Sequence, residues 1–368
     1  MVRNIAGRGD FTGSDQRPNM TTEDPWRFER QNFTCTGWSG NCVGQPFVLG
    51  NVVSRRTPYV MQWLFNLQRQ VTTNLLVETG YMGNFGRRLE RLRSTNEAFT
   101  RTSLTDTRSI AERRIFPMYG IIQQVDGVNN SNYHAFNLKI QQRFNRGLTL
   151  LAGYTWSKAI DNGSGIRSSA GEQSIAAYDW DLRPERGLSQ FHTAHRWVAS
   201  LIYDLPRLQQ SHPFLRQTLG GWQTSSIITF STGNPVRVGV IGDTNNMGGE
   251  GNYPDATGIS PSLNAGSTER FWNREAFDLT NPELRFRFGN AARNTLIGPG
   301  FAQWDFSLMK NFSLPREGHS IQIRWETFNF TNHANWNFPS TDVRNVAFGR
   351  VLTARDMRQM QFGVKYLF

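Results

Sequence analysis

Two histidines stand in the spacing His192-x-x-His195, so the first question is whether they bind a metal together. Side chains alternate between the two faces of a strand, so a separation of three places these rings on opposite faces. Shared metal ligation by this pair is therefore not expected. We interpret His195 as a structural residue at the start of a strand.

Three acids, Asp179, Asp181 and Glu185, gather in one polar stretch. Carboxylates are oxygen ligands of the kind that Ca²⁺ prefers, so a weak calcium site is one interpretation, and a solvated loop is the other. Residues 242–250 resemble a calcium loop loosely. They lack the acid at its closing position, and we reject a site there.

No set of residues supports catalysis. The glycines do not follow the strand-to-helix pattern of nucleotide sites. The serines, histidines and aspartates do not form a nucleophile elbow. We name no catalytic residue, no cofactor and no bound metal, and we predict that the protein is not an enzyme.

The only two cysteines, Cys35 and Cys42, lie in a polar, glycine-containing stretch. In an oxidising compartment they could close a small loop through a disulfide. The alternative is two free thiols. A zinc site would need further ligands nearby, and the sequence offers none.

These residues must be positioned by strands, because apolar side chains recur at every second position and no run approaches 18 apolar residues. Such alternation predicts strands with one apolar and one polar face. We expect strands at residues 59–70, 74–82, 133–144, 148–158, 193–204, 221–231, 303–312, 319–330 and 359–368, and the pattern admits one more at 119–125.

The connections between these strands alternate: short, long, short, long, medium, long, short, long. Outer-membrane barrels have this pattern, with short periplasmic turns and long external loops. We therefore predict an all-β fold: a partial antiparallel transmembrane β-barrel, with about nine to twelve strands of a larger barrel. Residues 1–58 are expected to form an external loop region and residues 59–368 the barrel portion. Because bacterial barrels have even strand numbers, we expect upstream sequence and bare edges at 59–70 and 359–368.

The last strand places Phe362, Val364, Tyr366 and Phe368 on one face, and the chain stops on the aromatic Phe368. A strand that closes a barrel has a reason to end in this way, because its apolar face meets lipid. These four residues resemble the C-terminal signal that the outer-membrane assembly machinery reads. The alternative is an ordinary amphipathic strand.

Charge agrees with this interpretation. The net charge is +11, but arginine and lysine are scattered and no block of five basic residues occurs, so nucleic-acid binding is not expected. Lipid phosphates of the outer leaflet are the expected counter-charge. Arg324 and Glu326 share the polar face of one strand, which predicts a charge pair facing the barrel interior.

Longer stretches resemble the Oar-like group of TonB-dependent outer-membrane receptors. The order and spacing of the segments carry the resemblance: SNYHAF (131–136), GYTWSKAID (153–161), HRWVAS (195–200), YDLP (203–206), GWQ (221–223), TFSTGNP (229–235), RNTLIGPGF (293–301), WD (304–305), Lys310 and ETFNFTNH (326–333).

The resemblance implies a multi-stranded barrel plugged by an N-terminal domain, on which TonB pulls to admit a ligand. It also implies an N-terminal carboxypeptidase-regulatory-like module. The sequence shows no signal peptide, plug or TonB-contacting segment. We therefore expect the C-terminal part of such a receptor, which cannot perform energised import alone.

The expected function is ligand binding and energised uptake by the full-length protein in the cell outer membrane. Its expected partners are outer-membrane lipid and lipopolysaccharide, the assembly machinery, TonB through the missing plug, and an external ligand that the loops would select. The alternative is a non-transporting, β-rich surface protein for binding or adhesion.

Overall fold

The computed structural model describes residues 34–35, 42–43, 48–117, 119–120, 122–144, 147–165, 176–210, 212–240, 242–248, 252–263, 267–316 and 318–368. Its main element is an antiparallel sheet built from β4 (Tyr59–Thr72), β5 (Leu75–Ser94), β6 (Ile122–Arg143), β7 (Leu148–Asp161), β9 (His195–Asp204), β10 (Trp222–Ser231), β15 (Phe301–Ser313), β16 (Ser320–Phe328) and β17 (Gln359–Leu367). The strands lie in the order β17-β16-β15-β10-β9-β7-β6-β5-β4. The nine predicted strands and the antiparallel fold are confirmed.

One face of this sheet is apolar from edge to edge. Residues paired across a ladder point to the same face, and the register pairs Phe65 with Tyr81, Tyr81 with Phe136, and Phe136 with Trp156. The same parity holds to the other edge, where Trp325 pairs with Phe362. We call this face the apolar wall. From β4 to β17 it includes Phe65, Tyr81, Leu138, Ala152, Leu201, Ile228, Leu308, Ile323 and Val364.

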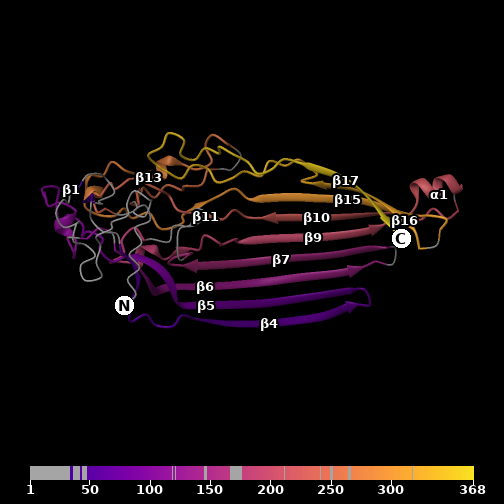
Figure 1. Cartoon of the computed structure of the whole chain (residues 1–368), viewed down its shortest axis with the longest axis horizontal. Helices are drawn as coiled ribbons and strands as arrows, with labels where there is room; N and C mark the ends of the chain where they lie inside the picture. Colours follow the sequence, from indigo (N-terminus) through magenta and orange to yellow (C-terminus); the bar gives the residue numbers. More distant parts are fainter. Residues whose placement is uncertain are drawn as a thin grey trace, which may run out of the picture.

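The two ends of the sheet differ. Short turns and one helix lie at one end, on the right of Figure 1, and the long connections gather at the other end. The long connections cover residues 95–121, 162–194, 232–300 and 329–358, and we call their described parts the loop cap. The predicted alternation of short and long connections is confirmed.

Two strands are longer than predicted. We expected strands that end at residue 82 and begin at residue 133, with one more strand possible at 119–125. Instead, β5 continues to Ser94, β6 begins at Ile122, and their pairing runs to Ser94 opposite Gln123, so residues 122–125 belong to β6 and not to a separate strand. Two register shifts lie between Gly86 and Glu90. Beyond them both faces carry polar side chains, so the apolar alternation that predicts a strand is absent from this part of the ladder.

The sheet path ends at β4 and β17. Every residue of both strands is exposed, and among the described strands neither has a neighbour on its outer side. The predicted bare edges are thus confirmed. Unpaired backbone groups along such edges are a template for pairing with further strands.

The medium connection between β9 and β10 contains a helix that the sequence analysis missed, α1 (Pro213–Leu219). Pro213 occupies the first turn, where a missing N–H costs nothing, and the His212 ring accepts a hydrogen bond from the Phe214 N–H (3.3 Å). At the other end, Lys310 Nζ on β15 donates to the carbonyl oxygens of Gln217 (2.5 Å) and Gly220 (2.5 Å).

The remaining elements are short. Strand β3 (Val48–Asn51) pairs with β6 in parallel, and β8 (Gly187–Leu188) pairs with β7. Three separate two-stranded antiparallel sheets are formed by β1 (Thr34–Cys35) with β2 (Cys42–Val43), β11 (Pro235–Val236) with β14 (Leu296–Ile297), and β12 (Asp255–Ala256) with β13 (Phe277–Asp278). The 3-10 turns are η2 (Ala111–Arg113), η3 (Arg183–Glu185), η4 (Arg274–Ala276) and η5 (Pro282–Arg285). Within the described residues, no helix combines the length and the apolar character needed to cross a bilayer.

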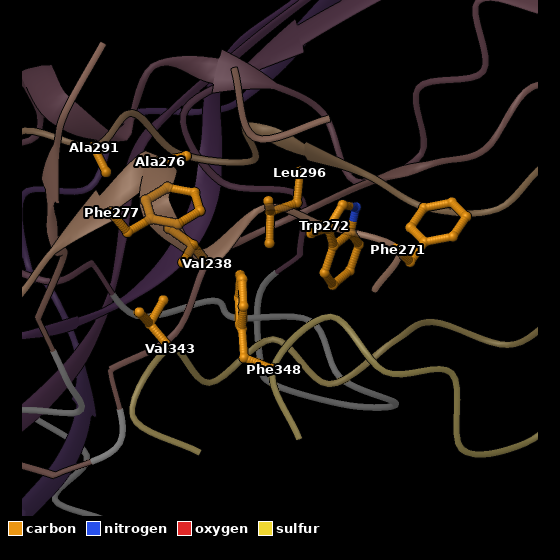
Figure 2. Close-up of a cluster of buried hydrophobic side chains, with 9 residues drawn as sticks. All are labelled: Val238, Phe271, Trp272, Ala276, Phe277, Ala291, Leu296, Val343 and Phe348. Atoms are coloured by element: carbon orange, nitrogen blue, oxygen red, sulfur yellow. The ribbon is translucent and has the colours of Figure 1, made fainter. Parts of the chain in front are cut away.

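A buried hydrophobic cluster lies in the loop cap and not against the sheet. It joins the connection between β10 and β15 to the connection between β16 and β17, as Figure 2 shows. Its members are Val238, Phe271, Trp272, Ala276, Phe277, Ala291, Leu296, Val343 and Phe348. The cap therefore has a core of its own, while wall residues such as Phe65 and Val364 stay exposed.

Candidate functional site

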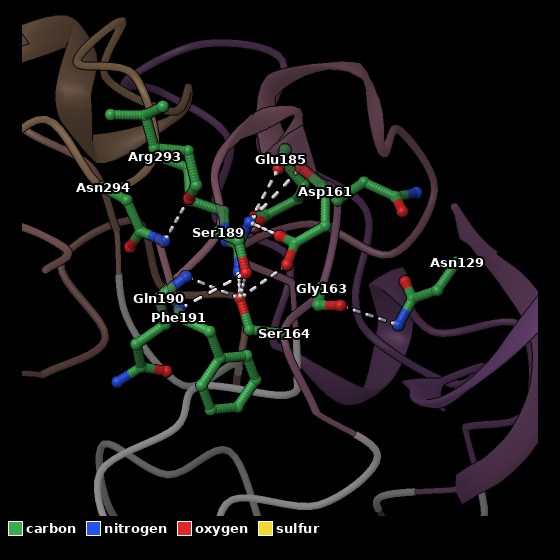
Figure 3. Close-up of polar contacts among 12 residues, drawn as sticks. Asn129, Asp161, Gly163, Ser164, Glu185, Ser189, Gln190, Phe191, Arg293 and Asn294 are labelled. Carbon is green, nitrogen blue, oxygen red and sulfur yellow. Dashed lines mark hydrogen bonds and ion pairs between the residues drawn. The ribbon is translucent and has the colours of Figure 1, made fainter. Parts of the chain in front are cut away.

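The loop cap is held together by a buried ion pair network around Arg293. Its Nη1 contacts Asp161 Oδ1 at 2.5 Å and its Nε lies 3.8 Å from Glu185 Oε2, with all three side chains at most 5% exposed. Figure 3 shows Arg293 reaching toward both acids and toward Ser164, whose hydroxyl accepts from Arg293 Nη2 at 2.8 Å. A buried charge is tolerated only when paired and hydrogen-bonded, so Arg293 fastens the β10–β15 connection to the β7–β9 connection.

A second buried group joins the β5–β6 ladder to the same cap. Arg93 contacts Asp126 (2.9 Å) and donates to the Asp179 carbonyl oxygen (2.8 Å). The Asp179 carboxylate accepts from the Ser94 N–H, and the Asp179 N–H donates to Glu97 Oε2 (3.0 Å). Burial raises the pKa of Asp179 to about 6 and raises the pKa of Glu97 well above its usual value.

These raised pKa values make the cap sensitive to pH. A raised folded-state pKa means that the folded form holds the proton more tightly, so the stabilisation is complete below about pH 4 and is lost as the pH rises through 6. A change in the pKa of Asp179 from 3.8 to about 6 corresponds to about 3 kcal/mol. We expect amides of residues 94–97 and 177–180 to be better protected from hydrogen exchange at pH 5 than at pH 7.5, after correction for intrinsic rates.

The matched controls for this prediction are two amide variants. Asp179→Asn should remove much of the difference between the two pH values. Asp181→Asn should leave it unchanged, because the contact with Arg183 lowers the pKa of Asp181 to about 2, outside the tested window. Equal effects of the two substitutions would contradict the assignment.

The structure separates the three acids that the sequence places together. Asp179 contacts the end of β5, Asp181 forms a surface pair with Arg183 (2.7 Å), and Glu185 faces Arg293. Neither a calcium site nor a solvated loop describes Asp179 and Glu185. Both side chains are buried, and each contacts a different segment of the chain. No group of three or more candidate metal ligands occurs among the described residues.

His192 and His195 also differ in position and in hydrogen-bond partner. His192 precedes β9 and is buried, where its Nδ1 accepts from the Ala159 N–H (3.3 Å). Burial lowers the pKa of His192. His195 opens β9, as predicted, and its Nδ1 lies 2.8 Å from the Tyr154 hydroxyl. His195 is thus a structural residue of the wall.

The rejected calcium loop has a different local structure. The Asp243 carboxylate accepts from the N–H groups of Met247 (2.6 Å) and Gly248 (2.7 Å), which closes a tight turn. Residues 249 and 250 lie outside the described part of the chain.

The polar face of the sheet, opposite the wall, carries side chains that bond across strands. Arg324 and Glu326 form the predicted charge pair (3.0 Å), and Gln361 on β17 donates to Glu326. At the other edge, Asn66 donates to Glu78 at 3.0 Å. Polar groups therefore line this face from one edge strand to the other.

The cysteine prediction concerns residues whose side chains lie outside the described set. The backbone register nevertheless places Cys35 directly opposite Cys42. Directly paired residues of an antiparallel ladder have Cα atoms about 4.5–5.5 Å apart, which suits a disulfide.

We therefore expect a Cys35–Cys42 disulfide in protein taken from an oxidising compartment. Mass spectrometry of unreduced, alkylated peptides should find the two residues linked and without alkylation. Recovery of both residues as alkylated thiols before reduction would show that the bond does not form.

Cavities lie both within the cap and beside it. One of about 450 Å³ is lined by cap residues, among them Asn252, Tyr253, Leu284 and Arg285. Another of about 620 Å³ lies where the wall meets the cap, between Trp197, Phe230 and Phe271. The first has the size and mixed polarity of a small-ligand site.

The outer membrane beta barrel domain family matches residues 7–361. The chain belongs to this family. As an outer membrane β-barrel domain, it lies in the outer membrane, with its apolar wall toward hydrocarbon and its polar face toward the interior.

Several solved structures align with most of this outer membrane β-barrel domain at low identity. The outer membrane transporter YddB from Escherichia coli is 12% identical, with 88% of this chain and 34% of that chain covered and a TM-score of 0.49. The FrpB iron transporter from Neisseria meningitidis is 13% identical (87% and 33% covered, TM-score 0.40). The siderophore receptor PiuA from Acinetobacter baumannii is 9% identical (83% and 35% covered, TM-score 0.32). The chain thus spans about a third of the length of each of these structures. No curated protein matches its sequence.

Three residues of the predicted C-terminal signal of this outer membrane β-barrel domain lie on one face of β17. Phe362, Val364 and Tyr366 lie on the wall, and the exposed Phe368 ring stacks on Tyr366 with centroids 5.8 Å apart.

We expect Phe368→Ala to lower the amount of folded barrel in the outer membrane, because it removes the terminal aromatic from the wall. Leu367→Ala, one position earlier and on the opposite face, is the control and should lower it less. Heat-modifiable mobility of the membrane fraction on gels measures both. Equal losses would show that the wall residue carries no special role.

Proposed function

We propose that this chain is the C-terminal portion of an Oar-like, TonB-dependent outer-membrane receptor that binds an external ligand and takes it up. In this proposal, residues 59–368 are barrel and the short turns face the periplasm. Residues 1–58 are proposed to be external, and of these only 34–35, 42–43 and 48–58 lie within the described residues. The observation that carries the proposal is the combination of a polar barrel face with an ordered cap that contains its own cavity.

The cap supports ligand binding through its rigidity. Its buried cluster and the Arg293 network fix loops that are far apart in sequence, as Figures 2 and 3 show. A preformed cavity binds without the entropic cost of ordering loops. The polar face, with its charge pair at Arg324 and Glu326, supports passage of a hydrated ligand along the interior.

Energised uptake would come from the rest of the receptor. The resemblance supplies the TonB-driven plug, and the sheet leaves two edges at which further strands could complete the barrel. Lipid and lipopolysaccharide would surround the wall, and the assembly machinery would read the C-terminal residues.

The test compares depletion of compounds from the growth medium by three strains. These are the wild type, a strain without the gene for this receptor and a strain without TonB. Compounds depleted only by the wild type are the expected result, and their mass spectra identify the ligand. Depletion that persists without TonB would contradict energised uptake, and recovery of the full-length protein in the soluble periplasm would contradict the barrel.

The alternative is a surface protein that binds or adheres without transport. The separate core of the cap favours it, because such a unit could bind a partner without a pore. Binding of a medium component to whole cells, without depletion beyond the bound amount, would support this alternative.

A further inference from the structure

The connection between β9 and β10 carries exposed apolar side chains at the short-turn end of the sheet. Within α1, Phe214 is 68% exposed and Leu219 is 60% exposed, and Leu215 is also exposed. Figure 1 shows α1 projecting beyond the ends of the strands, far from the loop cap. Exposed apolar side chains grouped on one short helix indicate a surface that another phase or molecule covers.

The contacts of α1 place its carboxyl end on the side of the apolar wall. Trp222 on β10 pairs with Lys310 on β15, and Lys310 pairs in turn with Ile323 on β16. Because paired residues share a face, all three belong to the wall. Trp222 Nε1 donates to the Thr218 carbonyl oxygen (2.9 Å). The helix is therefore continuous with the surface that meets lipid.

Lys310 explains why the helix is held there. Its ammonium group is a charge on a lipid-facing wall, yet the residue is only 5% exposed. The carbonyl oxygens of Gln217, Thr218 and Gly220 surround Nζ, and the negative end of the α1 dipole compensates its charge. The ring centroids of Trp222 and Phe312 lie 5.6 and 5.0 Å from Nζ, respectively. The end of α1 thus compensates the buried charge of Lys310, and Lys310 in turn holds the end of α1 on the wall.

The positive charge of the β9–β10 connection suits an anionic binding partner. Residues 205–221 contain Arg207 and Arg216 and no acidic residue. Basic residues beside an apolar helical face favour anionic phospholipid headgroups, while the apolar residues enter the boundary between headgroups and acyl chains.

We propose that α1 is an interfacial helix that inserts Phe214, Leu215 and Leu219 into the periplasmic leaflet of the outer membrane and binds its phospholipids. This inference rests on the orientation in the proposed function, in which the short turns face the periplasm. The helix and Lys310 would then fix the depth of the barrel in the bilayer.

The test uses full-length protein in vesicles of phosphatidylethanolamine and phosphatidylglycerol that carry a photoactivatable group on one acyl chain. After irradiation, tryptic peptides are examined by mass spectrometry. We expect labelled lipid on the peptide 208–216 as well as on peptides from β15 and β16. The double substitution Phe214→Ser and Leu219→Ser should reduce labelling of the helix several-fold without changing labelling of the strands. Val346→Ser, at an exposed apolar residue of the cap, is the control and should change neither.

The outcomes separate this inference from the proposed function. Labelled strands with an unlabelled α1 would overturn the interfacial helix, leave the barrel intact and indicate a periplasmic protein as the occupant. Absence of label from the strands as well would overturn the barrel itself. Heat-modifiable mobility shows whether the double variant has folded. If it has not, labelling of the unsubstituted α1 still decides the question.

Discussion

Replacing Arg293 by methionine is expected to open the loop cap while the barrel strands remain folded. The substitution keeps much of the side-chain volume but leaves Asp161 and Glu185 buried without their counter-charge. Removing one partner of a buried ion pair costs about 3–5 kcal/mol. Hydrogen exchange should therefore show lost protection in residues 161–165, 185–189 and 291–297, with protection in β9 and β10 unchanged.

The control for Arg293→Met is Arg183→Met. Arg183 also pairs with an aspartate, Asp181, at 2.7 Å, but its side chain is 90% exposed. Solvent screens such a pair, so no measurable change in exchange is expected. If the two substitutions have the same effect, the network around Arg293 does not hold the connections together.

Arginine at position 152 is expected to prevent stable insertion of the barrel. Ala152 lies in the middle of the wall, paired with Ile140 on β6 and Ala199 on β9. An arginine on the lipid face at the bilayer midplane costs about 2–4 kcal/mol. The expected result is a marked loss of heat-modifiable protein from the outer membrane and a lower urea midpoint for unfolding in vesicles.

The neighbouring glycine provides a matched control, Gly153→Arg. Gly153 is on the polar face, and a Cβ atom added there would meet nothing within 4 Å. The same charged residue, moved by one position, should then be accommodated in the aqueous interior. A greater loss from Gly153→Arg than from Ala152→Arg would reverse the assignment of the two faces.

Alternation of apolar residues made the sheet predictable, because the environments on its two faces differ along every membrane-spanning strand. That contrast disappears near Glu90 and Arg93, which lie on opposite faces of β5: Glu90 bonds to Arg55 and Arg93 bonds to Asp126, so both faces carry polar contacts, and the strand was predicted too short there. The helix α1 was missed for another reason. It has 7 residues, and Lys310, which stabilises its end, lies 93 residues further along the chain than Gln217.

The loop network could not be predicted from spacing. Arg293 and Asp161 are separated by 132 residues, and nothing in either local sequence indicates the partner. Proximity in sequence was misleading for Asp179 and Glu185, because the intervening turn directs them to different loops. The run that begins at Arg293 did contribute to the family resemblance, but a resemblance does not identify an ion pair.

The length of β5 sets where the chemistry of the cap takes place. Its 20 residues extend about 66 Å, and a tilt of about 45° leaves a rise of about 45 Å, against roughly 30 Å of hydrocarbon. In the proposed orientation the ladder therefore lifts Glu97 and Asp179 beyond the headgroups and into the surrounding medium. Acidification of the habitat would then change the protonation of these buried carboxyl groups without crossing the membrane, and antibodies or bacteriophages could reach the surface above them.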